Sequence, residues 1–361
     1  MKILHVELGR FLYGGARQVT YLLEGVGAHP EEHILACAEG ASIASAIANP
    51  RVRVFPLPCR GDADLGFLGR LRRLIREQQP DLMHIHSRRG ETLSALAAVL
   101  EHLPAVYSRR VDNPPLWLDL KFKYPRIKRI ITISQGIREV LIRHGVPDSQ
   151  IACVPSAVDT ERYRPGNDRE WLSKTFGLPG TAPVWAIVAQ LIPRKGHAVL
   201  FRALPEVLRK HPGLRVLVLG KGPLEGELRR LSADLGLSEN VRFEGFRTDL
   251  ERVLPCLDGL VHPAWMEGLG VSLLEAAACG IPIIACRSGG MPEIVRDGVN
   301  GRLIEPGDVA GLGAALSELL DHPHRAQAFG HAGRELATSE FSIRRMVQGN
   351  LEVYRQALAL P

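Results

Sequence analysis

Short apolar runs alternate with helical patterns along the whole chain, and this alternation constrains the fold more than any other feature of the sequence. Alternating strands and helices are typical of parallel sheets that carry helices on both faces. The 361 residues are enough for two domains of ordinary size. We therefore predict an α/β fold with two doubly wound, Rossmann-like parallel sheets. The predicted strands are residues 2–8, 52–57, 81–86, 104–108, 129–134, 151–155, 184–188, 214–219, 241–245, 259–261 and 281–285.

A polar stretch that contains Pro and Gly, residues 159–166, has the composition of a linker. It divides the chain into an N-terminal domain, residues 1–165, and a C-terminal domain, residues 166–340. The remaining residues, 341–361, contain a predicted helix with an apolar face. We expect this last helix to pack back on the N-terminal domain.

Positive charge gathers in the first half of the chain. The net charge is +6, and residues 1–180 carry 25 Lys and Arg against 19 Asp and Glu, whereas residues 181–361 carry 20 of each kind. The excess is densest in residues 51–130, with 16 basic and 8 acidic side chains. A basic first half indicates an anionic partner, which leaves a phosphorylated acceptor, an anionic membrane surface or a nucleic acid open.

No apolar run approaches the roughly 20 residues that span a bilayer, and the N-terminus reads as a first strand rather than a signal peptide. The six Cys form no Cys-x-x-Cys pair, so we expect buried thiols in a reducing compartment rather than disulfides or a zinc site. These features predict a cytoplasmic protein. An amphipathic helix over residues 65–78, with Arg70, Arg72, Arg73 and Arg76 outside its apolar stripe, either packs on a sheet with a solvated face or docks on an anionic membrane.

The sequence Trp-Met-Glu-Gly-Leu-Gly in the second half lies between an apolar strand and an apolar helix. Glycines at its end leave the backbone N–H groups of Gly268, Leu269 and Gly270 bare at a helix start, which suits a phosphate. Glu267 lies in the loop, and Glu275 lies about two turns into the helix. The alternative is an ordinary strand, turn and helix with a surface Glu at each end.

Basic or glycine-containing loops follow other strands of the second half. Arg194 and Lys195 lie in a loop after residues 184–188. This loop is either a solvated charged turn or a cationic clamp on a diphosphate. Gly220 follows the next strand, where a nucleotide could approach the backbone, and Arg247 follows residues 241–245. We therefore predict that a nucleotide binds at this edge of the sheet.

Two adjacent strands of the first half end in basic side chains. Ligands of open α/β sheets bind beyond the carboxyl ends of the strands, so we predict a functional edge there. Gly14 and Gly15 open a loop before a helix start, which suits an anion or a sugar hydroxyl, although such a pair is most often only a tight turn. The side chains that the two strands deliver are His86, Arg88, Arg89, Arg109, Arg110 and Asp112.

Taken together, these motifs resemble the retaining glycosyltransferases of family four, a group that includes bacterial phosphatidylinositol mannosyltransferases and lipopolysaccharide-core glucosyltransferases. Glu267 and Glu275 match the Glu-x7-Glu signature of that family, and Ser-Gly-Gly-Met-Pro-Glu at residues 288–293 matches its Gly-Gly-x-Pro-Glu turn. The resemblance covers nearly the whole chain and is strongest over residues 220–308. It implies the GT-B fold, in which two Rossmann-like domains face each other across a cleft.

The resemblance also implies roles for individual residues. Lys195 would neutralise the donor diphosphate, Glu267 would hold hydroxyls of the donor sugar, and Glu275 would bind the ribose. The backbone around Gly268, Leu269 and Gly270 would meet the sugar and phosphate, while Gly14 and Gly15 would face donor and acceptor. From their places after strands, we add Gly220 and Arg247 to the expected donor-binding residues, and we take Arg88, Arg109, Arg110 and Asp112 as candidate acceptor-binding residues.

The chain departs from the family pattern at three places. Gln190 stands where the family often has the first Arg of the phosphate clamp, so Arg194 is the expected replacement. Arg109 and Arg110 stand where many members have a His, which makes His86 a candidate for that catalytic role. The family's Asn-Gly before Val-Asp is Ser156-Ala157 here.

The expected function is transfer of a sugar from a nucleotide-diphosphate sugar to an acceptor hydroxyl, with retention of configuration. We expect the sugar to be a hexose and the reaction to belong to the synthesis of lipopolysaccharide or another cell-envelope glycan. The family needs no metal or other cofactor. The expected partners are the donor, a glycan or lipid-linked acceptor and an anionic inner membrane surface, without nucleic acid, because no aromatic platform or RNA motif accompanies the basic half. A sugar-nucleotide 2-epimerase and a non-catalytic binding protein are the alternatives.

Overall fold

The computed structural model of the protein describes residues 1–359, whose contacts divide the chain into two compact units. Unit 1 contains Met1–Ala157 and the helix that begins at Ile343, and unit 2 is Val158–Ser342. The predicted boundary after residue 165 lies further along the chain than this division. The reason is that the residues just before it belong to unit 2, where Arg334 Nη1 donates hydrogen bonds to the carbonyl oxygens of Thr160 (3.0 Å) and Tyr163 (2.8 Å).

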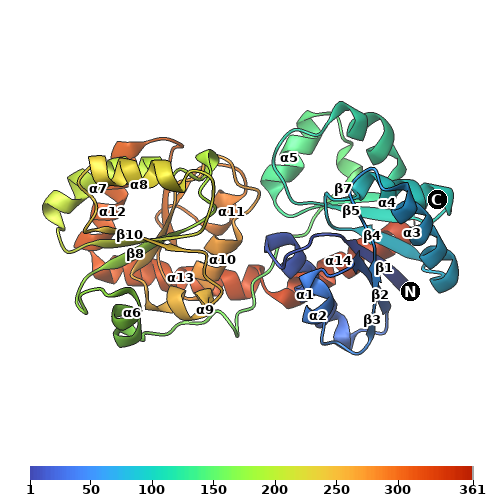
Figure 1. Ribbon diagram of the computed structural model, residues 1–361, viewed down its shortest axis with the longest axis horizontal. Helices are drawn as coiled ribbons and strands as arrows, with labels where there is room; N and C mark the ends of the chain where they lie inside the picture. The colour runs from blue at the N-terminus through green and yellow to red at the C-terminus, as the bar shows by residue number, and fades with distance from the viewer. Residues whose placement is uncertain (360–361) are drawn as a thin grey trace. The chain divides into compact units, whose positions relative to one another are not determined.

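Unit 1 is built on a fully parallel sheet of seven strands among the described residues, in the order β3-β2-β1-β4-β5-β6-β7 (Figure 1). The strands are β1 (Lys2–Glu7), β2 (Glu32–Ala38), β3 (Val52–Leu57), β4 (Leu82–Ile85), β5 (Ala105–Arg109), β6 (Arg129–Thr132) and β7 (Ile151–Cys153). The helices are α1 (Gly14–Gly25), α2 (Ser42–Ala46), α3 (Leu65–Gln78), α4 (Glu91–Leu100), α5 (Gln135–Arg143) and α14 (Ile343–Ala359), with short turns at Val26–Ala28, Asp119–Lys123, Tyr124–Arg126 and Asp148–Gln150.

Helices cover both faces of this sheet because successive strand residues point to opposite sides. Leu4 and Val6 of β1 belong to one core cluster, which also contains the apolar stripe of α3. Ile3 belongs to a second cluster, in which α14 contributes Leu351 and Tyr354. The last helix of the chain is thus part of the core of unit 1.

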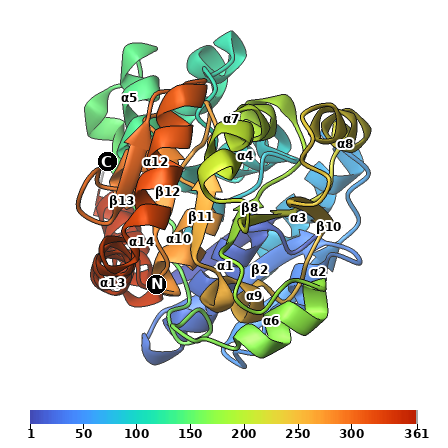
Figure 2. The same ribbon diagram turned by 90° about the vertical axis from the view of Figure 1, so that its left-hand side faces the viewer.

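Unit 2 is built on a parallel sheet of six strands, again counted over the described residues, in the order β10-β9-β8-β11-β12-β13 (Figure 2). The strands are β8 (Val184–Val188), β9 (Arg215–Leu219), β10 (Val241–Gly245), β11 (Gly259–His262), β12 (Ile283–Cys286) and β13 (Gly301–Ile304). The helices are α6 (Arg169–Phe176), α7 (His197–Lys210), α8 (Glu225–Asp234), α9 (Leu250–Val253), α10 (Val271–Ala278), α11 (Met291–Ile294), α12 (Val309–Asp321) and α13 (Pro323–Glu340), with short turns at Pro193–Lys195 and Leu254–Cys256.

Helix α7 packs beside α12 over one face of the unit 2 sheet, and α10 packs beside α13 on the other (Figures 1 and 2). Both units therefore have the predicted Rossmann-like architecture of a parallel sheet between two helical layers. Several helices begin at a residue whose side chain accepts a hydrogen bond from the first turn, as Asp64 does from Phe67 N (3.0 Å) and Asp308 from Gly311 N (2.8 Å). Local capping thus agrees with the alternating pattern.

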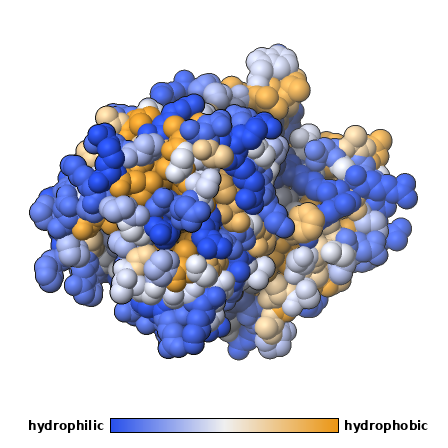
Figure 3. Space-filling model, turned by 60° about the vertical axis from the view of Figure 1, so that its left-hand side comes forward, coloured by the Kyte–Doolittle hydropathy of each residue, from blue (hydrophilic) through white to orange (hydrophobic). Residues whose placement is uncertain are grey.

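The face drawn in Figure 3 is mostly hydrophilic, with apolar side chains in scattered patches. Over residues 1–359, no helix combines the length and the apolar character that crossing a bilayer requires. All six cysteines are free thiols, and four of them are buried.

Candidate active site

The strand order reverses at one point in each sheet, between β1 and β4 in unit 1 and between β8 and β11 in unit 2. The loops after two such strands turn to opposite sides of the sheet, which leaves a crevice at their carboxyl ends. In unit 2 the loop after β8 carries Arg194 and Lys195, and the loop after β11 carries Glu267. The structure thus brings the predicted cations and the predicted carboxylate to the same point.

Lys195 and Glu267 form a largely buried ion pair. The Lys195 ammonium donates to Oε2 of Glu267, and the two side chains are 11% and 16% exposed. His262, the last residue of β11, donates from Nε2 to the same oxygen at 3.0 Å and is buried. Glu267 is therefore held from two sides, by one cation and one imidazole.

These contacts fix the charge state of the site. Burial alone would raise the pKa of Glu267, but the hydrogen bond from His262 and the charge of Lys195 outweigh it and lower the pKa to about 2. Burial lowers the pKa of His262, so its ring is neutral at pH 7. The site therefore holds an ionised Glu267 carboxylate over the whole physiological pH range.

Hydrogen bonds to backbone carbonyl oxygens tie the surrounding loops to one another. Trp265 N donates to the carbonyl oxygen of Arg194 at 3.1 Å, and Arg194 Nη1 donates to that of Met266 at 3.2 Å. The loop after β12 joins them, because Ser288 Oγ donates to Trp265 O at 2.7 Å and Gly290 N donates to Glu267 O at 3.1 Å. The Glu267 backbone is thereby locked between two neighbouring loops.

Glycines permit this close approach of loops. A Cβ on Gly289 would lie 1.9 Å from Glu267 O, and one on Gly196 would lie 2.0 Å from Pro263 O. Both residues also have positive φ, +54° and +72°. The Gly-Gly-x-Pro-Glu turn thus has a local reason for its first glycine, Gly289, which is the close passage of the Glu267 backbone.

The helix that follows the Glu-Gly-Leu-Gly sequence begins where it was predicted. Gly270 precedes α10 with φ of +99°, and no side chain caps the first turn. Gly268 and Leu269 are buried beside it. Glu275 lies inside α10 and is only 6% exposed, so it is not the surface carboxylate of the alternative interpretation.

Two other predicted donor residues have partners within the protein. Arg247 donates to both carboxylate oxygens of Asp249, at 2.8 and 2.6 Å, and its guanidinium lies over the ring of Phe176. Gly220 is required by packing, since a Cβ there would lie 1.9 Å from Ala189 O. Gly220 thus permits the close contact between the backbone segments that follow β8 and β9, whether or not a nucleotide also binds there.

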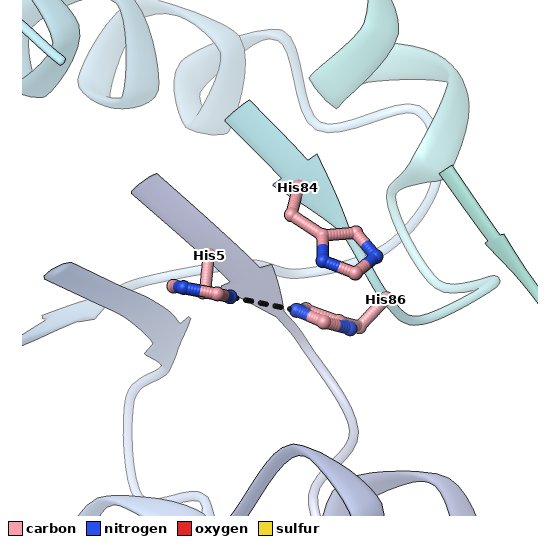
Figure 4. Close-up of side chains that lie close together, drawn as sticks. All are labelled: His5, His84 and His86. Atoms are coloured by element: carbon pink, nitrogen blue, oxygen red, sulfur yellow. Dashed lines mark hydrogen bonds between the residues drawn. The ribbon is translucent and has the colours of Figure 1, made fainter. Parts of the chain in front are cut away.

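His86 of unit 1 belongs to a group of buried histidines at the switch point of that sheet (Figure 4). His86 Nε2 and His5 Nδ1 are 2.9 Å apart, and His5 Nε2 lies 2.9 Å from His33 Nδ1. His84 contacts Ser108 Oγ at 2.8 Å and the hydroxyl of Tyr354 in α14 at 2.6 Å. We call His5, His33, His84 and His86 the histidine cluster.

The histidine cluster has some of the geometry of a metal site, because His5, His84 and His86 offer nitrogens within 4.8 Å of one another. Both nitrogens of His5 and of His84 are already hydrogen-bonded within the protein. Burial lowers the pKa of all three rings, and the charge of Arg110 lowers those of His84 and His86 further. A nearby guanidinium opposes a metal cation, so we interpret the cluster as a hydrogen-bonded core of neutral imidazoles.

The two arginines at the end of β5 have different surroundings. Arg109 is 3% exposed; its Nη1 donates to the Tyr124 hydroxyl at 2.8 Å, and its Nη2 donates to Asn113 O. This guanidinium therefore holds the chain that follows β5. Arg110 is half-buried; burial lowers its pKa, whereas the charge of nearby Glu7 raises it.

Gly15 and Glu7 complete the surroundings of Arg110. A Cβ on Gly15 would lie 3.4 Å from Arg110 Cδ, so the arginine runs beneath the start of α1. The predicted loop at this point is wrong in detail, because α1 already begins at Gly14 and contains both glycines. Glu7 is buried and accepts a hydrogen bond from Gly9 N at 2.8 Å. Of the other predicted acceptor residues, Arg88 is exposed and Asp112 is half-buried.

Comparison with known proteins agrees with this geometry. The family model described as glycosyl transferases group 1 matches residues 168–336, and that of glycosyltransferase family 4 matches residues 13–162. The chain thus carries a domain of the glycosyltransferase family 4 type, mostly within unit 1, followed by a domain of the glycosyl transferases group 1 type within unit 2.

Relatives of the chain include a GDP-mannose-dependent alpha-(1-6)-phosphatidylinositol monomannoside mannosyltransferase of Mycolicibacterium smegmatis, 37% identical over 215 residues, which are 55% of this chain and 54% of the relative. A D-inositol 3-phosphate glycosyltransferase of Nocardia farcinica is 34% identical over 241 residues, 64% of this chain and 53% of the relative. The chain thus spans about half the length of these relatives. The crystal structure of Anabaena HepE with UDP and glucose shares the fold, with a TM-score of 0.86 and 19% identity over 99% of this chain and 100% of that one.

Sequence reasoning gave no role to several residues that shape these candidate sites. His262 was not recognised as a partner of Glu267, although it is a polar residue at the end of an apolar strand. His5 and His84 are likewise single histidines within buried apolar strands. Such isolated polar residues are a usable signal, but their partners depend on which strands are neighbours.

Proposed function

We propose that the protein transfers a sugar from a nucleoside diphosphate sugar to an acceptor hydroxyl, with retention of the anomeric configuration. The observation that carries this proposal is the buried Lys195 ammonium beside the Glu267 carboxylate at the switch point of unit 2. A fixed cation at that point suits a diphosphate, and a fixed anion suits a sugar that becomes positive as its bond breaks. The matches to two glycosyltransferase family models support the same conclusion.

In the proposed reaction the bond between the anomeric carbon and the β-phosphate oxygen breaks, and its electron pair stays on the phosphate. Lys195 and Arg194 would stabilise the negative charge that develops there. The acceptor oxygen forms the new bond on the same face of the sugar, and its proton passes to the departing phosphate. Glu267 would hold hydroxyls of the donor sugar, and its low pKa keeps it ionised throughout.

The rest of the donor would follow α10 and its preceding loop. Backbone N–H groups around Gly268, Leu269 and Gly270 would meet the sugar and phosphates, because no side chain caps that helix start. Glu275 would accept hydrogen bonds from the ribose hydroxyls. We leave His86 out of the chemistry, because its ring is buried within the histidine cluster.

For the acceptor, we propose a phosphate-bearing, lipid-linked molecule of the cell envelope, reached from the cytoplasmic face of the membrane. The relatives named above act on phosphatidylinositol monomannoside and on inositol 3-phosphate, whose names both contain a phosphate group. Arg110 and the exposed Arg88 would supply positive charge at the acceptor edge of unit 1. The first half of the chain is basic, as such acceptors and an anionic membrane surface require.

The test is incubation of the protein with labelled GDP-mannose and UDP-glucose, with and without an extract of bacterial phospholipids and lipopolysaccharide. Label on an acceptor that appears only with active protein would support the proposal, and the one-bond carbon–proton coupling at the new anomeric centre would report retention. A free, altered sugar formed without acceptor would indicate an epimerase, and binding without turnover would indicate a binding protein. Glu267→Gln serves as the impaired control.

A further inference from the structure

Residues 114–128 form a surface on unit 1 that we call the apolar platform. Four large hydrophobic side chains stand out from it into solvent, with exposed fractions of 63% for Leu116, 63% for Trp117, 56% for Leu118 and 48% for Phe122. Scattered exposed apolar residues are normal on a protein surface. Four within one short stretch of chain are a patch, and such patches mark interaction sites.

The platform is firmly attached to the unit beneath it. Lys123 is buried and pairs with Glu91 at 2.9 Å and with Asp119 at 2.8 Å. Tyr124 is buried and receives the hydrogen bond from Arg109. Pro115 is also buried, so the segment has inner side chains of its own. The outward direction of the four apolar side chains is therefore a property of a fixed structure, because their backbone is held in place from below.

Basic side chains lie among the exposed apolar ones. The Lys121 ammonium is 5.1 Å from the ring centre of Trp117 and 5.8 Å from that of Phe122. Arg126 is exposed as well, and residues 114–128 carry four Lys or Arg against one Asp. Trp and Phe rings at the headgroup level, with Lys and Arg reaching the phosphates, are typical of surfaces that bind the membrane interface.

This charge decides between the possible occupants. A second copy of the chain would bring a like-charged platform against this one, which is unfavourable. The cores of protein interfaces are depleted in Lys, whereas here a Lys lies at the centre of the patch between two aromatic rings. An anionic bilayer accepts both the rings and the cations at once.

Helix α3, the membrane candidate in the sequence, is less suited to this role. Its Arg70 pairs with Asp64 at 3.1 Å, and its Arg72 and Arg76 both pair with Glu101, at 2.6 and 2.8 Å. Its apolar stripe, including Leu71, lies in the core. The charges of Arg70, Arg72 and Arg76 are thus paired within the unit, and the apolar stripe of α3 faces inward, so that within the described range 65–78 only Leu65 at its start is a highly exposed large hydrophobic residue.

We propose that the apolar platform docks unit 1 on an anionic lipid bilayer, with Leu116, Trp117, Leu118 and Phe122 at the headgroup boundary and Lys121 and Arg126 on lipid phosphates. The benefit of this docking rests on the proposed function, since it brings the enzyme to a lipid-linked acceptor. The binding itself does not depend on transfer. The platform begins a few residues after β5 ends, so it lies close in the chain to Arg109 and Arg110 of the acceptor edge.

The experiment is flotation of the full-length protein with vesicles of phosphatidylcholine containing 30% phosphatidylglycerol, beside vesicles of phosphatidylcholine alone. We expect binding to the anionic vesicles that weakens with salt. The double variant Trp117→Ser, Phe122→Ser should weaken it at least about tenfold, and Lys121→Glu should weaken it further at low salt. The matched controls Leu65→Ser and Arg73→Ala, which change exposed residues of α3, should bind as the wild type does.

The outcomes separate this proposal from the proposed function. Thermal unfolding of each variant verifies the fold, and nucleotide binding to unit 2 should be the same in all of them. Wild-type protein that stays with the buffer, a double variant that still floats, or loss of binding only in the α3 variants would each overturn the proposal. Transfer to a lipid acceptor in detergent should survive in the double variant, so loss of binding with retained transfer supports docking as a separate property.

Discussion

Replacement of Lys195 by Ala is the most direct test of the site. The ammonium is the only cation that the structure places on the Glu267 carboxylate among residues 1–359, and it is 11% exposed, so water screens it weakly. Removing it takes a charge away from the proposed leaving diphosphate and leaves Glu267 with His262 alone. The variant should therefore change both catalysis and stability.

The size of both effects follows from the burial. Two unit charges about 4 Å apart interact by about 4 kcal/mol at an effective dielectric constant near 20. Loss of one fixed donor to a developing anion costs about 10²- to 10³-fold in rate. For stability, the pKa of Glu267 lies at about 2 in the folded protein against 4.5 ordinarily, which corresponds to about 3 kcal/mol. Lys195 supplies part of this, so the variant should lose about 1–3 kcal/mol.

The contribution of the Glu267 carboxylate to stability depends on pH. Because the pKa of Glu267 is lower in the folded protein, its carboxylate stabilises unit 2 above pH 4.5, and this contribution is lost as the pH falls from 4.5 towards about 2. Without Lys195 the folded pKa of Glu267 rises and that acid-dependent contribution becomes smaller. Difference curves of stability between variant and wild type should then be largest at neutral pH and should shrink below pH 4.5.

The assay is initial-rate transfer from labelled donor, together with urea unfolding at pH 7 and pH 3.5. Lys174→Ala is the matched control, because that lysine pairs with Glu170 on the surface of the same unit, where both side chains are more than 70% exposed. Transfer by Lys195→Ala within threefold of wild type would refute the role of the ammonium. A constant stability difference at both pH values would refute its coupling to Glu267.

Three further outcomes follow from the same geometry. Glu275→Gln should weaken calorimetric binding of GDP or UDP by roughly tenfold to a hundredfold, since charge-assisted bonds to the ribose are lost, and unchanged affinity would contradict the ribose role. Gly289→Ala should lower the free energy of unfolding by about 3 kcal/mol more than the control Gly298→Ala does. Both glycines have positive φ, but only an alanine at position 289 would place its Cβ 1.9 Å from Glu267 O. Equal urea midpoints for the two variants would exclude the clash. Dialysis against EDTA should leave transfer unchanged, and activity that returns only with added Zn²⁺ or Mg²⁺ would show that the reaction needs a metal.

Much of the architecture could be predicted from the alternation of strands and helices, but two strands escaped it. β2 contains Ala36, Cys37 and Ala38, which lack the β-branched side chains that favour strands. β13 is only Gly301–Ile304, with an Arg among its four residues. Each of these strands forms because its backbone hydrogen-bonds to a neighbouring parallel strand. The local sequence does not show which strand will be its neighbour.

The candidate site shows the same division. The carboxyl ends of β8 and β11 were predictable as neighbours of a ligand, so Lys195 and Glu267 could be chosen from motifs and strand ends alone. Their bond to each other and to His262 depends on the order of the strands, which the sequence does not state. The histidine cluster is a stronger case, because it joins β1, β2 and β4 to a residue of α14 near the other end of the chain.

The return of α14 to unit 1 has a consequence for synthesis on the ribosome. The face of the first sheet that carries Ile3, Leu82 and Val106 acquires its α14 covering only after all of unit 2 has been translated. At ordinary elongation rates that interval is on the order of ten seconds or more. A nascent chain can therefore complete its second Rossmann-like unit while one apolar face of its first sheet is still exposed to solvent. The interval before termination is then the period in which the chain most needs a chaperone.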